Sequence, residues 1–341
     1  MEQRNALLAQ GLQADRILLN KFLAALSAKT DRETILYATR WTQPLMQGVS
    51  PDLLSITEED LQGMMEVIHG LKRPNLDLIL HSPGGSAAAA EAIVLYLRSK
   101  FKNVRVIVPQ AAMSAATMLA CSADEIVLGK HSFLGPIDPQ FVLNTPLGQR
   151  AVPADAVREQ FDQAIEECQN PKKAVAWFPM LAQYGPDILV QCENASALSK
   201  ELVKNWLKTY MFKDDPKKAS KSSSIARWLA DHQKFKTHSR HISRDELASH
   251  GLKIIPLEKD QVVQDLVLSV FHTVTQFFDS GGVIKLLANN IGKAFAKGVQ
   301  LAPIPAPQIV RQQSKPAAPK PATPTTTAPQ PGSPQSQSPT T

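Results

Sequence analysis

The stretch that decides the fold reads LDLILHSPGGSAAAAEAIVLYLRSKFKNVRVIVPQAAMSAATMLACSADEIVLGKHSFLGPIDPQ and spans Leu76–Gln140. Two mainly apolar runs, Leu76–Leu80 and Val104–Val108, enclose a helix-like segment from Ser86 to about Lys100. A second helix-like segment follows the second run. Strand, helix, strand and helix in this order predict a parallel βαβ unit, and such units carry their chemistry at the carboxyl ends of the strands.

Two unusual segments lie at these strand ends. The first strand stops at a Gly84-Gly85 turn, and tandem glycines free backbone N–H groups to point at a ligand. The second strand leads into a small-residue segment in which Ser114 is the only polar side chain between Gln110 and Thr117. A serine at a helix start can be a cap and nothing more. Beside two sets of backbone donors it also suits acyl transfer through an oxyanion.

Three motifs resemble those of the serine dehydrogenase proteinase family, distant relatives of Clp protease within the Clp/crotonase superfamily: HSPGG, VPQAAMSAATMLACSADEIVL and LGPIDPQ. The resemblance extends over roughly Ile35–Lys253. It implies an α/β protein with a Clp/crotonase-like ββα spiral fold and additional helices, commonly assembled as a ring-like homo-oligomer. It also implies a serine-type hydrolase, a peptidase, that acts on a peptide or protein substrate.

The same resemblance implies roles for individual residues. Ser114 is the nucleophile, and the backbone N–H groups of Gly84 or Gly85 and of Ala115 form the oxyanion hole. Where such families usually show Ser-Ala-Gly-Thr, this chain has Ala116 in place of the glycine. We expect the extra methyl group to narrow the approach to the nucleophile without abolishing it.

The general base has several candidates. In Clp protease a His follows the nucleophile within the next βαβ unit, but the comparable region here, LGPIDPQ, contains none. The family's later Thr-His motif is matched at His238, which is the preferred base. Asp138 lies in the shared LGPIDPQ motif and could orient a base or cap a turn. The alternatives that stay open are His131, His241, Lys172 and Lys173, the last two for a Ser–Lys dyad as in the related signal peptide peptidases.

Composition narrows the class of protein. A chain of 341 residues with 43% hydrophobic and 20% charged residues is ordinary for a globular protein. The net charge is +6, and three cations without any acid lie beyond residue 301, so nothing points to nucleic acid. Three scattered cysteines fit a reducing cytoplasm. We expect no metal, no cofactor, no signal peptide and no transmembrane segment.

Four segments follow from the sequence pattern. Residues 1–30 predict an amphipathic helix, broken near Gly11, that docks on the body or on a neighbouring subunit rather than on a membrane surface. Residues 31–255 form the Clp/crotonase-like domain, and residues 256–301 hold two amphipathic helices, Val262–Phe278 and Val283–Val299. Residues 302–341 contain eleven of the 25 prolines and predict a disordered Pro/Ala/Thr-rich tail.

The sequence therefore predicts a serine-type peptidase in which a His or Lys takes the Ser114 proton and backbone amides hold the oxyanion. Two alternatives stay open. A crotonase-like enzyme would use the same oxyanion hole for acyl-CoA thioesters and would not need a nucleophilic serine. A catalytically inactive oligomeric scaffold would present its helices and its tail to partners.

Overall fold

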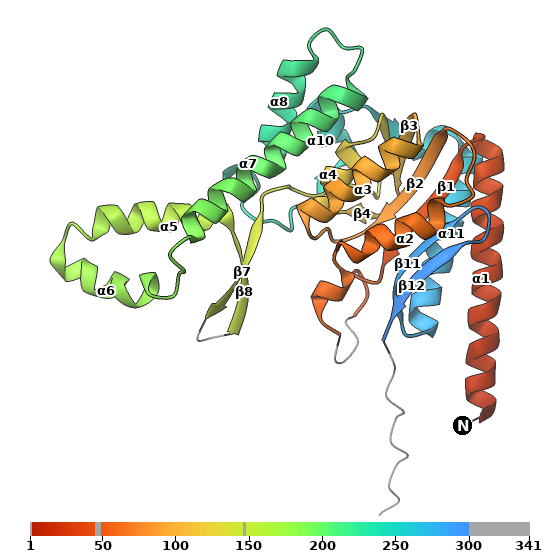
Figure 1. Cartoon of the computed structure of the whole chain (residues 1–341), viewed down its shortest axis with the longest axis horizontal. Coiled ribbons are helices and arrows are strands. Elements are labelled where there is room, and N and C mark those ends of the chain that lie inside the picture. Colours follow the sequence, from red (N-terminus) through yellow and green to blue (C-terminus); the bar gives the residue numbers. More distant parts are fainter. Residues whose placement is uncertain (1, 45–48, 146–147, 300–341) are drawn as a thin grey trace, which may run out of the picture. The chain divides into compact units, whose positions relative to one another are not determined.

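The main sheet has seven strands in the order β10-β5-β3-β2-β1-β11-β12 (Figure 1). The computed structural model describes residues 2–44, 49–145 and 148–299. The five strands from β10 to β1 are parallel, whereas β11 and β12 are antiparallel. The strands are β1 (Glu33–Thr39), β2 (Asn75–His81), β3 (Asn103–Val108), β5 (Glu125–Leu128), β10 (Ile254–Pro256), β11 (Val283–Asn289) and β12 (Ala294–Gly298).

Helices cover both faces of this sheet (Figure 1). In β2, Leu78 and Leu80 belong to one buried cluster, while Ile79 belongs to a second cluster with Leu23 and Val270. A strand that is buried on both faces needs a nearly continuous apolar run, which is the pattern of residues 76–80. The first face carries α2 (Glu59–Ile68), α3 (Ala87–Lys100) and α4 (Ala115–Cys121), and the second carries α1 (Glu2–Thr30) and α11 (Gln261–Ser280).

A second, smaller sheet has the order β4-β6-β9 and consists of β4 (Ala111–Ala112), β6 (Phe133–Leu134) and β9 (Ile242–Ser243). The short strands β4 and β6 follow β3 and β5 of the large sheet along the chain. The sequence β3, β4 and α4 is therefore one ββα turn, and β5 with β6 begins the next. The predicted α/β class and ββα spiral are confirmed.

An arm follows β6 and has its own small core around Val157, Ile188 and Cys192. Figure 1 shows α5 and α6 reaching beyond the edge of the large sheet, while α7 returns and meets α4. The arm consists of β7 (Gln140–Thr145), β8 (Gly148–Pro153), α5 (Ala154–Glu167), α6 (Pro171–Leu181) and α7 (Ile188–Trp206). The chain then passes through a π-helical turn (Leu207–Met211), α8 (Lys218–Leu229), α9 (His232–Phe235), α10 (Arg244–Ser249) and the 3-10 turn Leu257–Lys259; a further 3-10 turn, Pro51–Leu54, precedes α2.

The helix predicted over Val283–Val299 is wrong, because this segment is the β11–β12 hairpin. Leu287 of β11 joins one buried cluster and its neighbours Leu286 and Ala288 join the other, so the segment is apolar on two faces of a strand. Gly292, with φ of 86°, provides the left-handed conformation that the hairpin loop needs. Because β11 pairs with β1, the β11–β12 hairpin completes the same sheet as the strands of residues 31–255.

The other two helices predicted near the ends of the chain are present in the structure. The helix over Val262–Phe278 is confirmed as α11, and the N-terminal helix is confirmed as α1, which continues through Gly11 without a break. Among the described residues, no helix has both the length and the apolar character that crossing a membrane requires. The predicted tail, residues 302–341, lies outside the described residues.

Candidate active site

Ser114 stands at the junction of β4 and α4 in a strained backbone conformation, with φ of 51° and ψ of −122°. Such a conformation costs a non-glycine residue about 1–3 kcal/mol, and conformations of this kind concentrate at functional sites. The Ser114 side chain makes no capping hydrogen bond with α4, so the helix-cap alternative does not hold. Its neighbours Met113 and Ala115 are buried, which leaves a half-exposed hydroxyl on an otherwise apolar junction.

The Gly84-Gly85 turn lies directly against this serine. A Cβ atom on Gly84, whose φ is 98°, would lie 2.7 Å from Ser114 Cβ and 2.5 Å from the Met113 carbonyl oxygen. On the other side, a Cβ on Gly85 would lie 2.4 Å from the Ile56 nitrogen. Only glycine fits at either position, because the turn is enclosed between the serine and the Ile56 segment.

Backbone hydrogen bonds fix the turn and decide which amides it offers. Ile56 N–H donates to the Gly84 carbonyl at 2.6 Å, and Ser86 N–H donates to the Ile56 carbonyl at 2.9 Å. The Gly84 N–H donates to Ser82 Oγ at 3.2 Å. Among the residues that the structure describes, the N–H groups of Gly85 and Ala115 have no hydrogen-bond partner. These two amides are therefore the donors available to a ligand beside Ser114.

Asp138 brings two histidines together. Its carboxylate is buried, and Oδ1 lies 2.8 Å from Nδ1 of His238. The second oxygen, Oδ2, lies 3.1 Å from Nδ1 of His232. A carboxylate on Nδ1 selects the tautomer in which the opposite nitrogen, Nε2, is free to accept a proton. The structure thus places His238, the preferred base candidate, against Asp138, together with a histidine that sequence analysis did not single out.

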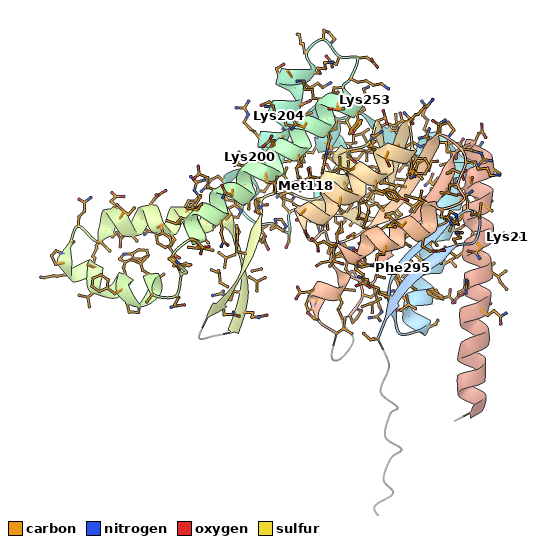
Figure 2. All side chains as sticks on the ribbon, in the orientation of Figure 1. Lys21, Met118, Lys200, Lys204, Lys253 and Phe295 are labelled. Atoms are coloured by element: carbon orange, nitrogen blue, oxygen red, sulfur yellow. The ribbon has the colours of Figure 1, made fainter. Side chains whose placement is uncertain are left out.

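One cavity of about 630 Å³ joins these parts, since Ser114, Ala115, both glycines of the turn and His238 all line it. Ser114 and His238 make no direct hydrogen bond in this structure, and catalytic hydrogen bonds often tighten only when substrate is bound. Figure 2 shows Met118 where α4 meets α7, and this residue belongs to the apolar wall. The larger apolar side chains of this wall are Ile56, Met118, Ile137, Phe141, Val142 and Leu198.

The alternative bases lie elsewhere. His131 is exposed, and the exposed His241 stacks on Phe133 with the ring centroids 3.7 Å apart. Lys172 and Lys173 are exposed at the start of α6, where Lys173 pairs with Glu167 at 3.6 Å. None of these four side chains lines the Ser114 cavity. Within the described part of the chain, no three His, Cys, Asp or Glu residues form a group that could hold a metal ion.

Ala116 does not narrow the site as expected. Its methyl group is fully buried in the main hydrophobic cluster, and Ala116 does not line the cavity. The side chain of the residue two places after Ser114 points into the core because α4 has already begun there. The departure from Ser-Ala-Gly-Thr is therefore a packing difference.

Comparisons with known proteins show the family of the chain. The family model described as ClpP-like SDH-type serine proteinase matches residues 19–175. The uncharacterized protein MJ0137 of Methanocaldococcus jannaschii is 30% identical over 235 residues, which cover 69% of this chain and 72% of that protein. The chain belongs to the ClpP-like SDH-type serine proteinase family. Membership in a family of serine proteinases supports peptidase chemistry in general.

Two further similarities are shorter or more distant. The uncharacterized protein MJ1495 of the same organism is 41% identical to this chain over 86 residues, or 25% of this chain and 30% of that protein. A solved structure titled as a mutant of the 1510-N membrane-bound stomatin-specific protease aligns with a TM-score of 0.34 and 15% identity, covering 59% of this chain and 74% of that one.

The residues of the site divide at the end of the family match. Ser114, the two glycines and Asp138 lie inside residues 19–175, whereas both histidines that contact Asp138 lie beyond it. His238 carried a sequence signal through its Thr-His motif. His232, in the segment DHQKF, carried none, because nothing in the local pattern links it to a carboxylate 94 residues away.

Proposed function

We propose that this protein hydrolyses peptide bonds with Ser114 as nucleophile, His238 as general base and Asp138 as the group that orients the base. The observation that carries the proposal is that a strained, uncapped serine and a carboxylate-bound histidine line the same cavity. The backbone amides of Gly85 and Ala115 serve as oxyanion donors, with Gly84 shaping the turn between them.

The chemistry follows from these positions. His238 Nε2 takes the proton of Ser114 Oγ while Oγ forms a bond to the carbonyl carbon of the substrate. The carbonyl oxygen becomes an oxyanion that accepts hydrogen bonds from the two free amides. The carbon–nitrogen bond then breaks, and the departing amine takes the proton from His238. Water, activated by the same imidazole, releases the acyl group from Ser114 and restores the enzyme.

The His238–Asp138 hydrogen bond supports the peptidase over the inactive scaffold. The scaffold alternative rested on the missing His after Ser114, and a later histidine now takes that place at the cavity wall. A crotonase-like enzyme would need the oxyanion donors and no Ser–His–Asp set. The ring-like homo-oligomer and the cytoplasmic location stay predictions. Light scattering of the full chain would measure the oligomeric state.

Replacing Ser114 tests the proposal. We expect Ser114→Ala to lose fluorophosphonate labelling and to lower turnover of an unstructured protein substrate by about 10³-fold or more. Ser99→Ala is the matched control, because Ser99 lies exposed on α3 and its hydroxyl bonds only the Tyr96 carbonyl. Equal turnover by the Ser114 variant would refute the peptidase. Tight binding of acyl-CoA esters without labelling of Ser114 would favour the crotonase-like alternative.

A further inference from the structure

The Asp138 carboxylate has two oxygens, and each one is held by a different imidazole. Oδ1 lies 2.8 Å from His238 Nδ1 and Oδ2 lies 3.1 Å from His232 Nδ1. We propose that His232 is a positioning residue, which fixes the plane of the Asp138 carboxylate and through it the imidazole of His238. The proposal rests on the function proposed above and assigns a role to a residue outside the Ser–His–Asp set.

The surroundings of Asp138 make a second donor necessary. The Asp138 side chain is only 2% exposed, so neither oxygen can rely on bulk water. Among the described residues, the two imidazoles are the carboxylate's only hydrogen-bond partners. A buried carboxylate oxygen without a donor costs about 1–3 kcal/mol or more, and that cost would favour rotation of the group away from His238. His232 removes this cost at Oδ2 and leaves Oδ1 facing His238.

The backbone around Asp138 is held independently of the carboxylate. Ile137 N–H donates to the Leu229 carbonyl at 2.9 Å, and the Pro139 carbonyl accepts from Ala154 N–H at 2.9 Å. These bonds fix the main chain on both sides of Asp138 but leave its terminal torsion free, because that torsion is broad for a carboxylate. The orientation of the carboxylate therefore depends on what its two oxygens contact.

His232 is itself held in place by α9. Asp231 Oδ1 accepts from Lys234 N–H at 3.0 Å, which caps this short helix, and Phe235 is buried against Trp228. Lys236 then adopts a left-handed conformation, with φ of 64°, and its N–H donates to the His232 carbonyl at 2.7 Å. This turn redirects the chain so that His238 returns to the carboxylate that His232 already contacts. Residues 232–238 thus form a clip around Asp138.

The two histidines of the clip have different positions relative to the cavity. His238 lines the cavity that contains Ser114, whereas His232 is not among the lining residues. Its ring is 13% exposed and its Nδ1 is turned to Asp138. His232 therefore acts on the reaction through Asp138, without touching the reacting atoms.

Two substitutions of His232 in the full chain test this role. His232→Ala removes the donor to Oδ2, and we expect kcat to fall about 10- to 100-fold while KM changes less than about twofold. His232→Asn places an amide N–H where Nδ1–H was, and we expect it to recover most of the lost rate. His241→Ala is the matched control, since His241 lies in the same segment, stacks on Phe133 and does not contact Asp138.

A spectroscopic measurement separates this proposal from the peptidase itself. In protein labelled with ¹⁵N-histidine, the His238 Nδ1–H bonded to Asp138 should give a sharp low-field proton resonance. We expect His232→Ala to broaden that resonance through exchange with water, and His241→Ala to leave it unchanged. An unchanged resonance and wild-type kcat in His232→Ala would overturn the positioning role, as would equal losses of kcat and melting temperature in the Ala and Asn variants. Loss of the resonance in His232→Ala, in a protein whose wild type never acylates Ser114, would instead leave the positioning role intact and overturn the peptidase.

Discussion

Asp138 and Asp60 are both buried carboxylates, but their donors give them different tasks. Asp60, on α2, receives Lys285 Nζ at 2.9 and 2.8 Å and the Tyr37 hydroxyl at 2.8 Å. Burial, together with the charge of Asp60, raises the pKa of Tyr37 well above its usual value, so that hydroxyl stays a fixed donor. The donors to Asp138 are imidazoles, a side chain that can act as a general acid or base. Burial is common to both sites, and the donor decides which carboxylate can take part in proton transfer.

The Asp60 cluster also supports the oxyanion turn from behind. Lys285 Nζ donates to the Ser55 carbonyl at 2.6 Å, and the next residue, Ile56, pairs with the Gly84-Gly85 turn. Lys285 comes from β11 and Lys297, 3.4 Å from Asp60, comes from β12. Phe295 of β12, labelled in Figure 2, packs against the same core. The C-terminal hairpin therefore anchors the segment that holds one half of the site, while the 232–238 clip holds the other half.

Asp138→Asn should give the largest effect, and this effect should be on activity. An amide has one acceptor oxygen and cannot accept from both Nδ1–H groups, so His238 loses the tautomer that catalysis needs. We expect kcat to fall about 10³–10⁴-fold and the free energy of unfolding to change by only about 1–2 kcal/mol. Steady-state kinetics and denaturant unfolding measure the two quantities. A collapse of stability with this substitution would make Asp138 a structural anion like Asp60 and end the distinction.

Asp60→Ala should show the opposite pattern, with the effect falling on stability. The substitution leaves the Lys285 ammonium buried without its counter-charge, and we expect a loss of about 3–5 kcal/mol in the free energy of unfolding. The double variant Asp60→Leu with Lys285→Met replaces the pair by apolar groups and should lie within about 2 kcal/mol of the wild type. Urea titrations of both proteins decide the matter. A double variant as unstable as Asp60→Ala would mean that lost packing, rather than the unpaired cation, sets the cost.

The sequence was informative where signals are local. The apolar runs, the Gly-Gly turn and Ser114 lie within 65 residues and predict the βαβ unit and the nucleophile. The partners of the two buried carboxylates are not local: Lys285 reaches Asp60 across 225 residues, and His232 reaches Asp138 across 94. A lysine in an apolar run such as VIKLLAN fits an amphipathic helix as well as a buried strand. Only the pairing of β11 with β1 decides between them.

His81 differs from the two histidines that contact Asp138, because it is a buried imidazole with no carboxylate partner among the described residues. It ends β2, contacts Thr42 Oγ1 at 3.3 Å and lies against Phe271. Burial lowers the pKa of His81 to about 4, from an ordinary 6.5. Below pH 6.5 the unfolded chain therefore binds a proton at His81, whereas the native protein binds it only at about pH 4. As the pH falls from 6.5 to 4, the free energy of unfolding should decrease by about 3 kcal/mol.

The matched measurement for His81 compares the wild type with His81→Gln. We expect the difference in unfolding free energy between the two proteins to be constant above pH 6.5 and to shift in favour of the variant as the pH falls to 4. A difference that does not depend on pH would mean that native and unfolded protein take up the His81 proton equally readily, and that burial does not lower the pKa of His81.

Ala116→Gly should give the smallest effect, and it should fall on stability alone. Removing a buried methyl group and placing glycine in α4 should lower the free energy of unfolding by about 1–2 kcal/mol. Because the methyl group points into the core and not into the cavity, kcat and KM should stay at their wild-type values. A gain in kcat/KM would show that Ala116 restricts access to Ser114 after all. Unchanged kinetics with lower stability would place Ala116 with Asp60, among the residues that hold the site without shaping its chemistry.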